Sequence, residues 1–197
     1  MIVELGHFAL ILAFAVALLQ ATLPLYGAAR RDARLMALAD PAAMMQLVLI
    51  AAAFGALTYA FVVSDFSLRL VTLNSHTDKP MLYKVAGVWG NHEGSLLLWV
   101  LALALFGACA VWFGGNLPAT LKARVLSVQG MIGAAFLAFL LFTSNPFLRL
   151  ANPPMNGDDL NPLLQDPGLA FHPPFLYLGY VGLSMSFSFA VAALIEG

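Results

Sequence analysis

Long apolar runs separated by shorter polar segments make up most of the chain. A membrane-spanning helix needs about 20 mostly apolar residues. Runs of that kind lie near residues 6–26, 42–63, 95–113, 125–143 and 174–195. Because unpaired backbone groups are not tolerated in hydrocarbon, each run is predicted to be an α-helix, with Asp40 and Pro41 as N-cap and first residue of the second helix. The pattern indicates an all-α integral membrane protein with about five transmembrane helices in a single membrane domain, residues 1–197.

The composition agrees with this class. Hydrophobic residues make up 61% of the chain and charged residues 10%, whereas soluble domains carry roughly 25% charged residues. The net charge of −1 gives no electrostatic case for binding nucleic acid. Cys109, the single cysteine, lies inside an apolar run, so neither a disulfide framework nor a Cys-x-x-Cys-His haem attachment motif is present in the sequence. We interpret Cys109 as a small packing residue.

The charges around the first apolar run predict its orientation. A cleavable signal carries positive charge before its apolar core, but the first seven residues contain Glu4 and no Lys or Arg. Arg30, Arg31 and Arg34 follow the run instead. Because cytoplasmic loops are enriched in Lys and Arg, the N-terminus is predicted to lie on the outer, periplasmic side of the membrane.

This orientation puts two longer polar segments, about residues 64–94 and 144–173, on the outer face, where we expect them to form ordered loops. They carry His76, His92 and His172 and most of the acidic residues. The inner loops are short connectors. Any chemistry is therefore expected on the outer face.

The first outer loop ends in Trp89-Gly-Asn-His-Glu-Gly-Ser-Leu-Leu-Leu-Trp99. His92 and Glu93 do not begin a His-Glu-x-x-His zinc motif, because position 96 is Leu. They are interpreted as hydrogen-bonding groups at helix ends, and Ser95 as a possible cap of the third helix. Trp89 and Trp99 suit a headgroup interface or a packed helix end.

The second outer loop is rich in proline and ends in His172-Pro173-Pro174. A residue before proline is biased toward extended backbone, so His172 is expected to be extended, with Pro174 in the first turn of the fifth helix. Two interpretations of His172 remain open. It ligates a metal or haem iron, or it is an interfacial histidine bonded to the backbone.

The other histidines are interpreted as structural. His7 follows Glu4 by three residues in the first helix, and a mutual hydrogen bond is expected. His76 lies in a polar stretch and is expected to be exposed. The small residues of the fifth helix are interpreted as sites of close helix packing.

Three motifs together resemble a known family. They are the Trp89 to Trp99 segment, Phe142-Thr-Ser-Asn-Pro-Phe147, and Asp159-Leu-Asn-Pro-Leu-Leu-Gln-Asp-Pro-Gly168 followed by Phe171-His-Pro-Pro174. In this order they resemble the N-terminal part of the CcmF family, the haem lyases of the bacterial cytochrome c maturation system I. The resemblance covers nearly the whole chain.

The resemblance implies a multi-pass protein of the bacterial inner membrane that positions haem for thioether attachment to apocytochrome c. It implies b-type haem as substrate and His172 as an axial ligand of the haem iron, matched through its Phe-His-Pro-Pro context. It assigns no catalytic residue. The implied partners are a periplasmic haem chaperone, apocytochrome c with its thiol-handling proteins, the remaining part of the lyase, and membrane lipid.

The sequence departs from the family pattern by its length. The Trp-rich signature, the second outer histidine and the membrane histidines of the family come later than Gly197. The chain is therefore expected to be a fragment, a split subunit or part of a longer lyase, incomplete as an enzyme by itself. Two alternatives remain open: the related haem lyase of nitrite reductase, and a non-catalytic membrane scaffold or transporter subunit with a partner-docking Pro-rich loop.

Overall fold

The computed structural model describes the backbone of all 197 residues and every side chain except those of Leu164 and Leu169. The described backbone is helical apart from turns, irregular loop segments and one isolated antiparallel bridge between Leu68 and Arg149. The elements are α1 (Ile2–Arg30), α2 (Ala33–Met36), α3 (Ala39–Val62), α4 (Arg69–Asn74), α5 (Met81–Gly87), α6 (His92–Phe113), α7 (Ala119–Phe142), the 3-10 turn η1 (Pro162–Leu164) and α8 (Pro167–Glu196).

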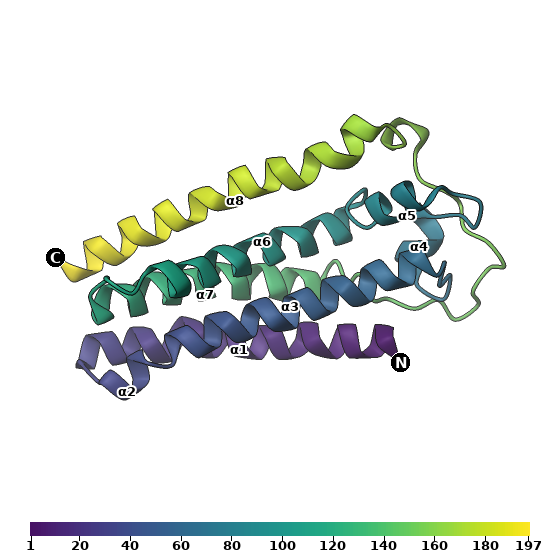
Figure 1. Ribbon diagram of the computed structural model, residues 1–197. Helices are drawn as coiled ribbons and strands as arrows, with labels where there is room; N and C mark the ends of the chain where they lie inside the picture. The colour runs from purple at the N-terminus through teal and green to yellow at the C-terminus, as the bar shows by residue number, and fades with distance from the viewer.

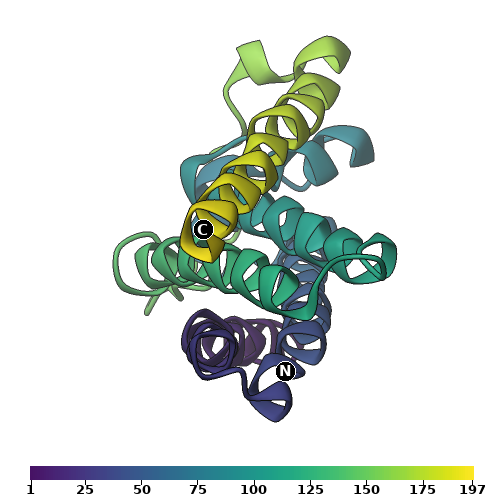
Figure 2. The same ribbon diagram turned by 90° about the vertical axis from the view of Figure 1, so that its left-hand side faces the viewer.

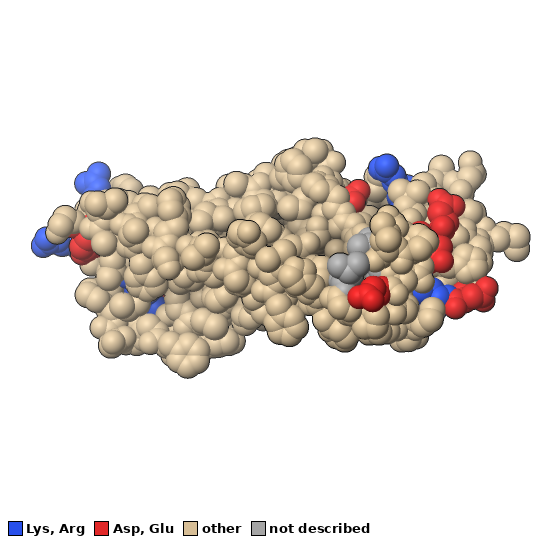
Figure 3. Space-filling model, turned by 90° about the horizontal axis from the view of Figure 1, so that it is seen from above, with Lys and Arg blue, Asp and Glu red and all other residues tan. Residues whose placement is uncertain are grey.

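Five helical segments are long and apolar enough to cross a membrane: Ile2–Arg30, Ala33–Val62, His92–Phe113, Ala119–Phe142 and Ala170–Glu196. The predicted all-α membrane class and its five spans are therefore confirmed. Figure 3 shows the charged residues gathered toward the two ends of the molecule, with an uncharged band between them. This is the surface expected of a bundle whose middle faces lipid.

The long helices run side by side, with the two chain termini at opposite ends of the bundle (Figure 1). We call the end that holds residues 63–91 and 143–166 the loop end, and the end that holds residues 31–38 and 114–118 the connector end. Helix α1 packs against α3 and α7, and α3 packs against α6. Helix α8 lies at the edge of the bundle, where it contacts α6 and α7 along the membrane segment (Figures 1 and 2).

Small side chains bring the central helices close together. On α1, Ala13, Ala17 and Ala21 recur at helical spacing and are all buried. A Cβ added at Gly130 of α7 would lie 2.8 Å from the backbone nitrogen of Ala21, so α7 and α1 approach at a distance that only glycine permits. Lipid supplies no hydrophobic driving force between helices, and close van der Waals packing at small residues takes its place.

Two predicted helix starts are wrong by a few residues. Helix α3 begins at Ala39 after Leu38, and Asp40 is not its cap, because the Asp40 carboxylate instead accepts a hydrogen bond from Lys122 Nζ at 2.7 Å. Helix α6 is capped by Asn91, whose Oδ1 accepts from the Gly94 amide at 2.7 Å. Ser95 does not cap this helix. Its hydroxyl donates to the His92 carbonyl one turn back.

The start of α8 is the largest correction. The helix begins at Pro167, so His172 is helical, not extended, and Pro173 and Pro174 lie inside the helix. The second loop accordingly ends at residue 166, not near residue 173. Asp166 gives the physical reason, because its Oδ1 accepts from the Gly168 amide at 2.8 Å in the manner of an N-cap, with Pro167 in the favoured position after it.

Candidate functional site

His172 lies in the second turn of α8, at the loop end of the bundle, and is exposed. Its neighbours are large and apolar: Phe171 is 54% exposed and Phe175 is 71% exposed. Phe175 follows His172 by three residues and therefore shares its side of the helix. The site thus presents one imidazole beside uncovered aromatic rings, an arrangement that suits a flat, apolar ligand with a metal at its centre.

The prolines after His172 leave a gap in the hydrogen bonding of α8, and Trp89 fills it. In a regular helix the amide of residue 174 would donate to the carbonyl of Ala170, but proline has no N–H. The indole Nε1–H of Trp89 donates to that carbonyl instead, at 2.8 Å. Trp89, which lies between α5 and α6, thus ties the helical turn that carries His172 to the rest of the bundle.

A pocket of about 350 Å³ lies beside this contact. Trp89, Asn91, His92 and Ser95 line one side, and Pro173 and Tyr177 of α8 line the other. His172 does not line it, so the structure does not bring His92 and His172 together in one pocket. His92 instead packs its ring edge-on against Phe139, with 6.0 Å between the ring centres.

The loop before α8 is joined to the loop before α6. The Arg69 amide donates to the Leu148 carbonyl, and the Leu150 amide donates to the Ser67 carbonyl, each at 2.9 Å. Further along, the amide of Asp158 donates to the Thr72 carbonyl at 2.8 Å.

Gly157 is required at this crossing, since a Cβ there would lie 2.1 Å from the Ser75 carbonyl oxygen.

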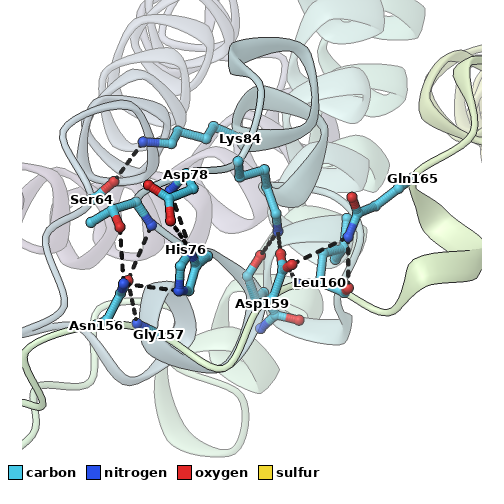
Figure 4. A network of polar contacts seen from close by, with 12 residues as sticks. Ser64, His76, Asp78, Lys84, Asn156, Gly157, Asp159, Leu160 and Gln165 are labelled. Carbon is cyan, nitrogen blue, oxygen red and sulfur yellow. Dashed lines mark hydrogen bonds and ion pairs between the residues drawn. The ribbon is translucent and has the colours of Figure 1, made fainter.

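An ion pair closes the same junction. Lys79 Nζ lies 2.7 Å from Asp159 Oδ1, and its side chain is 0% exposed whereas that of Asp159 is 45% exposed. Lys79 also donates to the Asn74 carbonyl at 2.9 Å. Asp159 lies close to Gln165, whose Nε2 donates to the Leu160 carbonyl at 3.1 Å (Figure 4). The pair therefore fixes the segment that leads into η1 and α8.

The environment of the pair shifts both pKa values. Burial lowers the pKa of Lys79, although the hydrogen bond and charge of Asp159 oppose that shift. The pKa of Asp159 is lowered below 3.8: desolvation acts to raise it, but the hydrogen bond and charge of Lys79 together with the Leu160 amide outweigh the desolvation. The Asp159 carboxyl is therefore ionised at neutral pH and accepts the hydrogen bond from Lys79 Nζ.

The remaining histidines have structural contacts. The expected hydrogen bond between His7 and Glu4 is wrong. The Nε2 atom of His7 lies 3.0 Å from Asn145 Nδ2 instead, and the His7 ring stacks on Phe147. Glu4 pairs with Arg149 instead.

His76 is also less exposed than expected. It is half-buried, with its Nε2 at 2.9 Å from Asn156 Nδ2 (Figure 4). Among the residues whose side chains are described, no group of three or more His, Cys, Asp and Glu is placed to hold a metal ion.

The five spans and the ordered loop end define a multi-pass membrane protein. Comparison with known proteins then gives the family. A profile of the Cytochrome C assembly protein family matches residues 89–196, which include α6, α7 and α8. The chain belongs to this family, and it is a multi-pass protein of the bacterial inner membrane.

The most similar relatives carry related names. The chain is 75% identical to the cytochrome c-type biogenesis protein ccl1 of Rhodobacter capsulatus over 197 residues, which is 100% of this chain and 30% of that protein. It is 51% identical to CcmF of Escherichia coli, covering 100% of this chain and 31% of that protein. It is 42% identical to NrfE of Haemophilus influenzae, covering 99% and 31%.

A solved structure shares the fold. The cytochrome c haem lyase CcmF superposes with a TM-score of 0.84 at 30% sequence identity, over 100% of this chain and 31% of that one. The predicted resemblance to the N-terminal part of CcmF is therefore confirmed. The chain spans 30% of the length of the Rhodobacter capsulatus protein, so what a whole relative does is a proposal for this chain.

The sequence located His172 but not the contacts that hold it. The Trp89 bond to Ala170 and the Lys79 pair with Asp159 join residues 81 and 80 positions apart. Trp89 carried a signal only through its place in a long motif, and Lys79 carried none.

Proposed function

We propose that this chain is the haem-handling, N-terminal module of a cytochrome c haem lyase. The module helps to position haem so that its vinyl groups meet the thiols of apocytochrome c. The observation that carries the proposal is the exposed His172 beside exposed Phe171 and Phe175 at the loop end. The names of the relatives, which are cytochrome c-type biogenesis proteins, support it.

His172 is the residue that binds the haem iron in this proposal. His172 would supply one imidazole nitrogen to the haem iron. The neighbouring phenylalanines cover part of the apolar macrocycle. The contribution of the protein is orientation, because the attachment chemistry belongs to haem and thiol.

The loop end lies on the periplasmic side in this proposal. There the module receives b-type haem from a periplasmic haem chaperone and meets apocytochrome c with its thiol-handling proteins. The basic residues Arg30, Arg31 and Arg34 lie at the connector end, which supports a cytoplasmic position for that end.

The experiment replaces His172 by Ala in the full-length protein, expressed with its partner proteins. We expect the haem absorbance of the purified protein to fall and the yield of holocytochrome c to fall with it, while the amount of protein in the membrane is unchanged. His92→Ala is the matched control, because His92 is also exposed at the loop end but lies in the pocket away from His172. An undiminished haem content in His172→Ala would refute the proposed role.

A nitrite-reductase haem lyase is the second candidate that the sequence left open, and the chain is also 42% identical to the cytochrome c-type biogenesis protein NrfE. Deletion of the gene separates the two, since the apocytochrome that accumulates identifies the substrate. A haem absorbance spectrum of the purified protein tests the scaffold or transporter alternative, for which no bound haem is expected.

A further inference from the structure

A small cavity lies in the membrane-spanning part of the bundle, and three buried glutamines line it. They are Gln20 of α1, Gln46 of α3 and Gln129 of α7, which are 3%, 6% and 3% exposed. The rest of the lining is apolar and mostly small, with alanines and glycines of four helices: Ala17, Ala43, Ala104, Gly107, Gly130 and Gly133. Its volume is about 20 Å³.

Each glutamine is anchored through its amide nitrogen. Gln20 Nε2 donates to the Leu126 carbonyl at 2.9 Å, and Gln46 Nε2 donates to the Ala13 carbonyl at 2.7 Å. Gln129 Nε2 donates to Ser188 Oγ at 2.8 Å. These bonds fix which end of each amide is nitrogen, because carbonyl oxygens accept, and Ser188 donates its own proton to the Ser184 carbonyl.

The anchoring leaves carbonyl oxygens without partners. Among the described residues, neither Gln20 Oε1 nor Gln129 Oε1 accepts a hydrogen bond, and both atoms are buried. A buried polar atom that lacks a hydrogen bond is destabilising, and in hydrocarbon no solvent corrects the loss. Both side chains line the same cavity, so a donor bound inside it would lie beside both glutamines.

We propose that this cavity is a binding site for one water molecule, which donates one hydrogen to Gln20 Oε1 and the other to Gln129 Oε1. A cavity holds a water when it offers about 10–15 Å³ and two to four polar partners. The volume here meets the first condition with room for only one molecule, and the two oxygens meet the second, with Gln46 as a further polar neighbour. A cation is disfavoured, because the lining carries no charged residue.

The bound water extends a polar chain across the bundle. It connects α1 to α7, and Gln129 continues the chain to Ser184 and Ser188 of α8 through bonds of 3.2 and 2.8 Å. Helix α8 is the least buried of the five spans, because only 17% of its apolar membrane segment is buried inside the protein. The water therefore supports the attachment of the helix that carries His172.

A double-mutant cycle on the full-length protein in nanodiscs tests the site. Gln20→Met and Gln129→Met each remove one acceptor at similar volume, and each is expected to lower Tm by about 2–4 °C. Each Met variant also loses the hydrogen bond of its own amide nitrogen, and this loss cancels in the cycle because it is the same in the single and the double variant. Because no direct bond joins the two side chains among the described residues, a shared water makes the double variant lose less than the sum of the single losses.

The control cycle pairs Gln20→Met with Thr72→Val, which removes a buried hydroxyl at the loop end, and additive losses are expected there. Additive losses in the Gln20 and Gln129 cycle would overturn the proposal. If either Met variant fails to fold, an experimental wild-type structure at a resolution that shows water tests the proposal instead. We expect a density peak within hydrogen-bonding distance of both glutamine oxygens. A cavity without that peak would overturn the proposal.

Discussion

One indole N–H compensates for what Pro174 removes from α8. Proline inside a helix deletes a backbone bond and disfavours the helix by about 3 kcal/mol. Here the freed Ala170 carbonyl accepts from Trp89 at 2.8 Å, so the buried oxygen keeps a partner. The turn that bears His172 is therefore held by a side chain from a different loop.

Replacing Trp89 by Phe is expected to loosen this turn while keeping most of the ring packing. An unpartnered buried carbonyl costs about 1–3 kcal/mol. Hydrogen exchange over residues 167–177, measured by mass spectrometry, should become faster, and haem capture by the full-length protein should weaken.

Trp112→Phe is the matched control for that experiment. Trp112 lies on α6 at the connector end and is 54% exposed. Equal exchange rates in wild type and Trp89→Phe would contradict the supporting role of the indole.

At the residue scale, the sequence predicted which histidine belongs to the candidate site, but not its conformation or the contacts that hold its helical turn. His172 was found through its neighbours in the chain, Phe171 and the two prolines, and its conformation was mispredicted because Pro167 and Pro174 both satisfy the rule for a first helical turn. The choice between them was made by Asp166, whose side chain caps the earlier start. Trp89 could not be paired with Ala170 from sequence, since a backbone carbonyl leaves no pattern in the side chains.

At the scale of elements, the two loops of the loop end form one structure. A backbone bridge, the Gly157 contact and the ion pair of Lys79 with Asp159 join them. The sequence predicted both loops and their shared side of the bundle, and it did not predict that α4 and α5 lie within the first of them. Those helices are only six and seven residues long, so tertiary contacts decide their existence.

Asp159→Asn is expected to destabilise the loop end by about 2 kcal/mol. Breaking a fully buried pair costs about 3–5 kcal/mol, and the partial exposure of Asp159 reduces that figure. Thermal unfolding of the full-length protein measures the change. Asp158→Asn is the control, as Asp158 is exposed and no ion pair is described for it; a similar loss in both variants would argue against the ion pair.

The same pair predicts a dependence on acid. The pKa of Asp159 is lowered in the folded state, mainly by the hydrogen bond and charge of Lys79 against the opposing desolvation, so the folded state binds fewer protons than the unfolded state as the solution becomes acidic. The stabilisation is complete above the ordinary carboxyl range and is lost as pH drops through the lowered pKa. When unfolding is measured over a series of pH values, the free energy of unfolding should therefore fall less on acidification in Asp159→Asn than in wild type.

At the scale of the whole molecule, the odd number of spans puts the termini on opposite sides of the membrane. The apolar pattern predicted this arrangement correctly, because length and hydropathy alone define a span. Which neighbours each helix has was not predictable, since nearly every helix face is apolar and small residues occur throughout. The edge position of α8 follows from packing that only the structure reveals.

Cysteine labelling tests the orientation. Met155 at the loop end is 101% exposed, and Asn116 at the connector end is also exposed. With Cys109 replaced, a membrane-impermeant maleimide added from the periplasmic side should label Met155→Cys and leave Asn116→Cys unlabelled until the membrane is opened. The reverse pattern would show that the loop end faces the cytoplasm.

The enclosed ammonium of Lys79 has a consequence for biogenesis. Its counter-ion, Asp159, is made 80 residues later, after α6 and α7 have been synthesised. During translation, the first loop cannot close over Lys79 without enclosing an uncompensated charge. The first loop is therefore expected to stay open until the second loop has been synthesised, which delays the assembly of this surface until after the fourth span has been made.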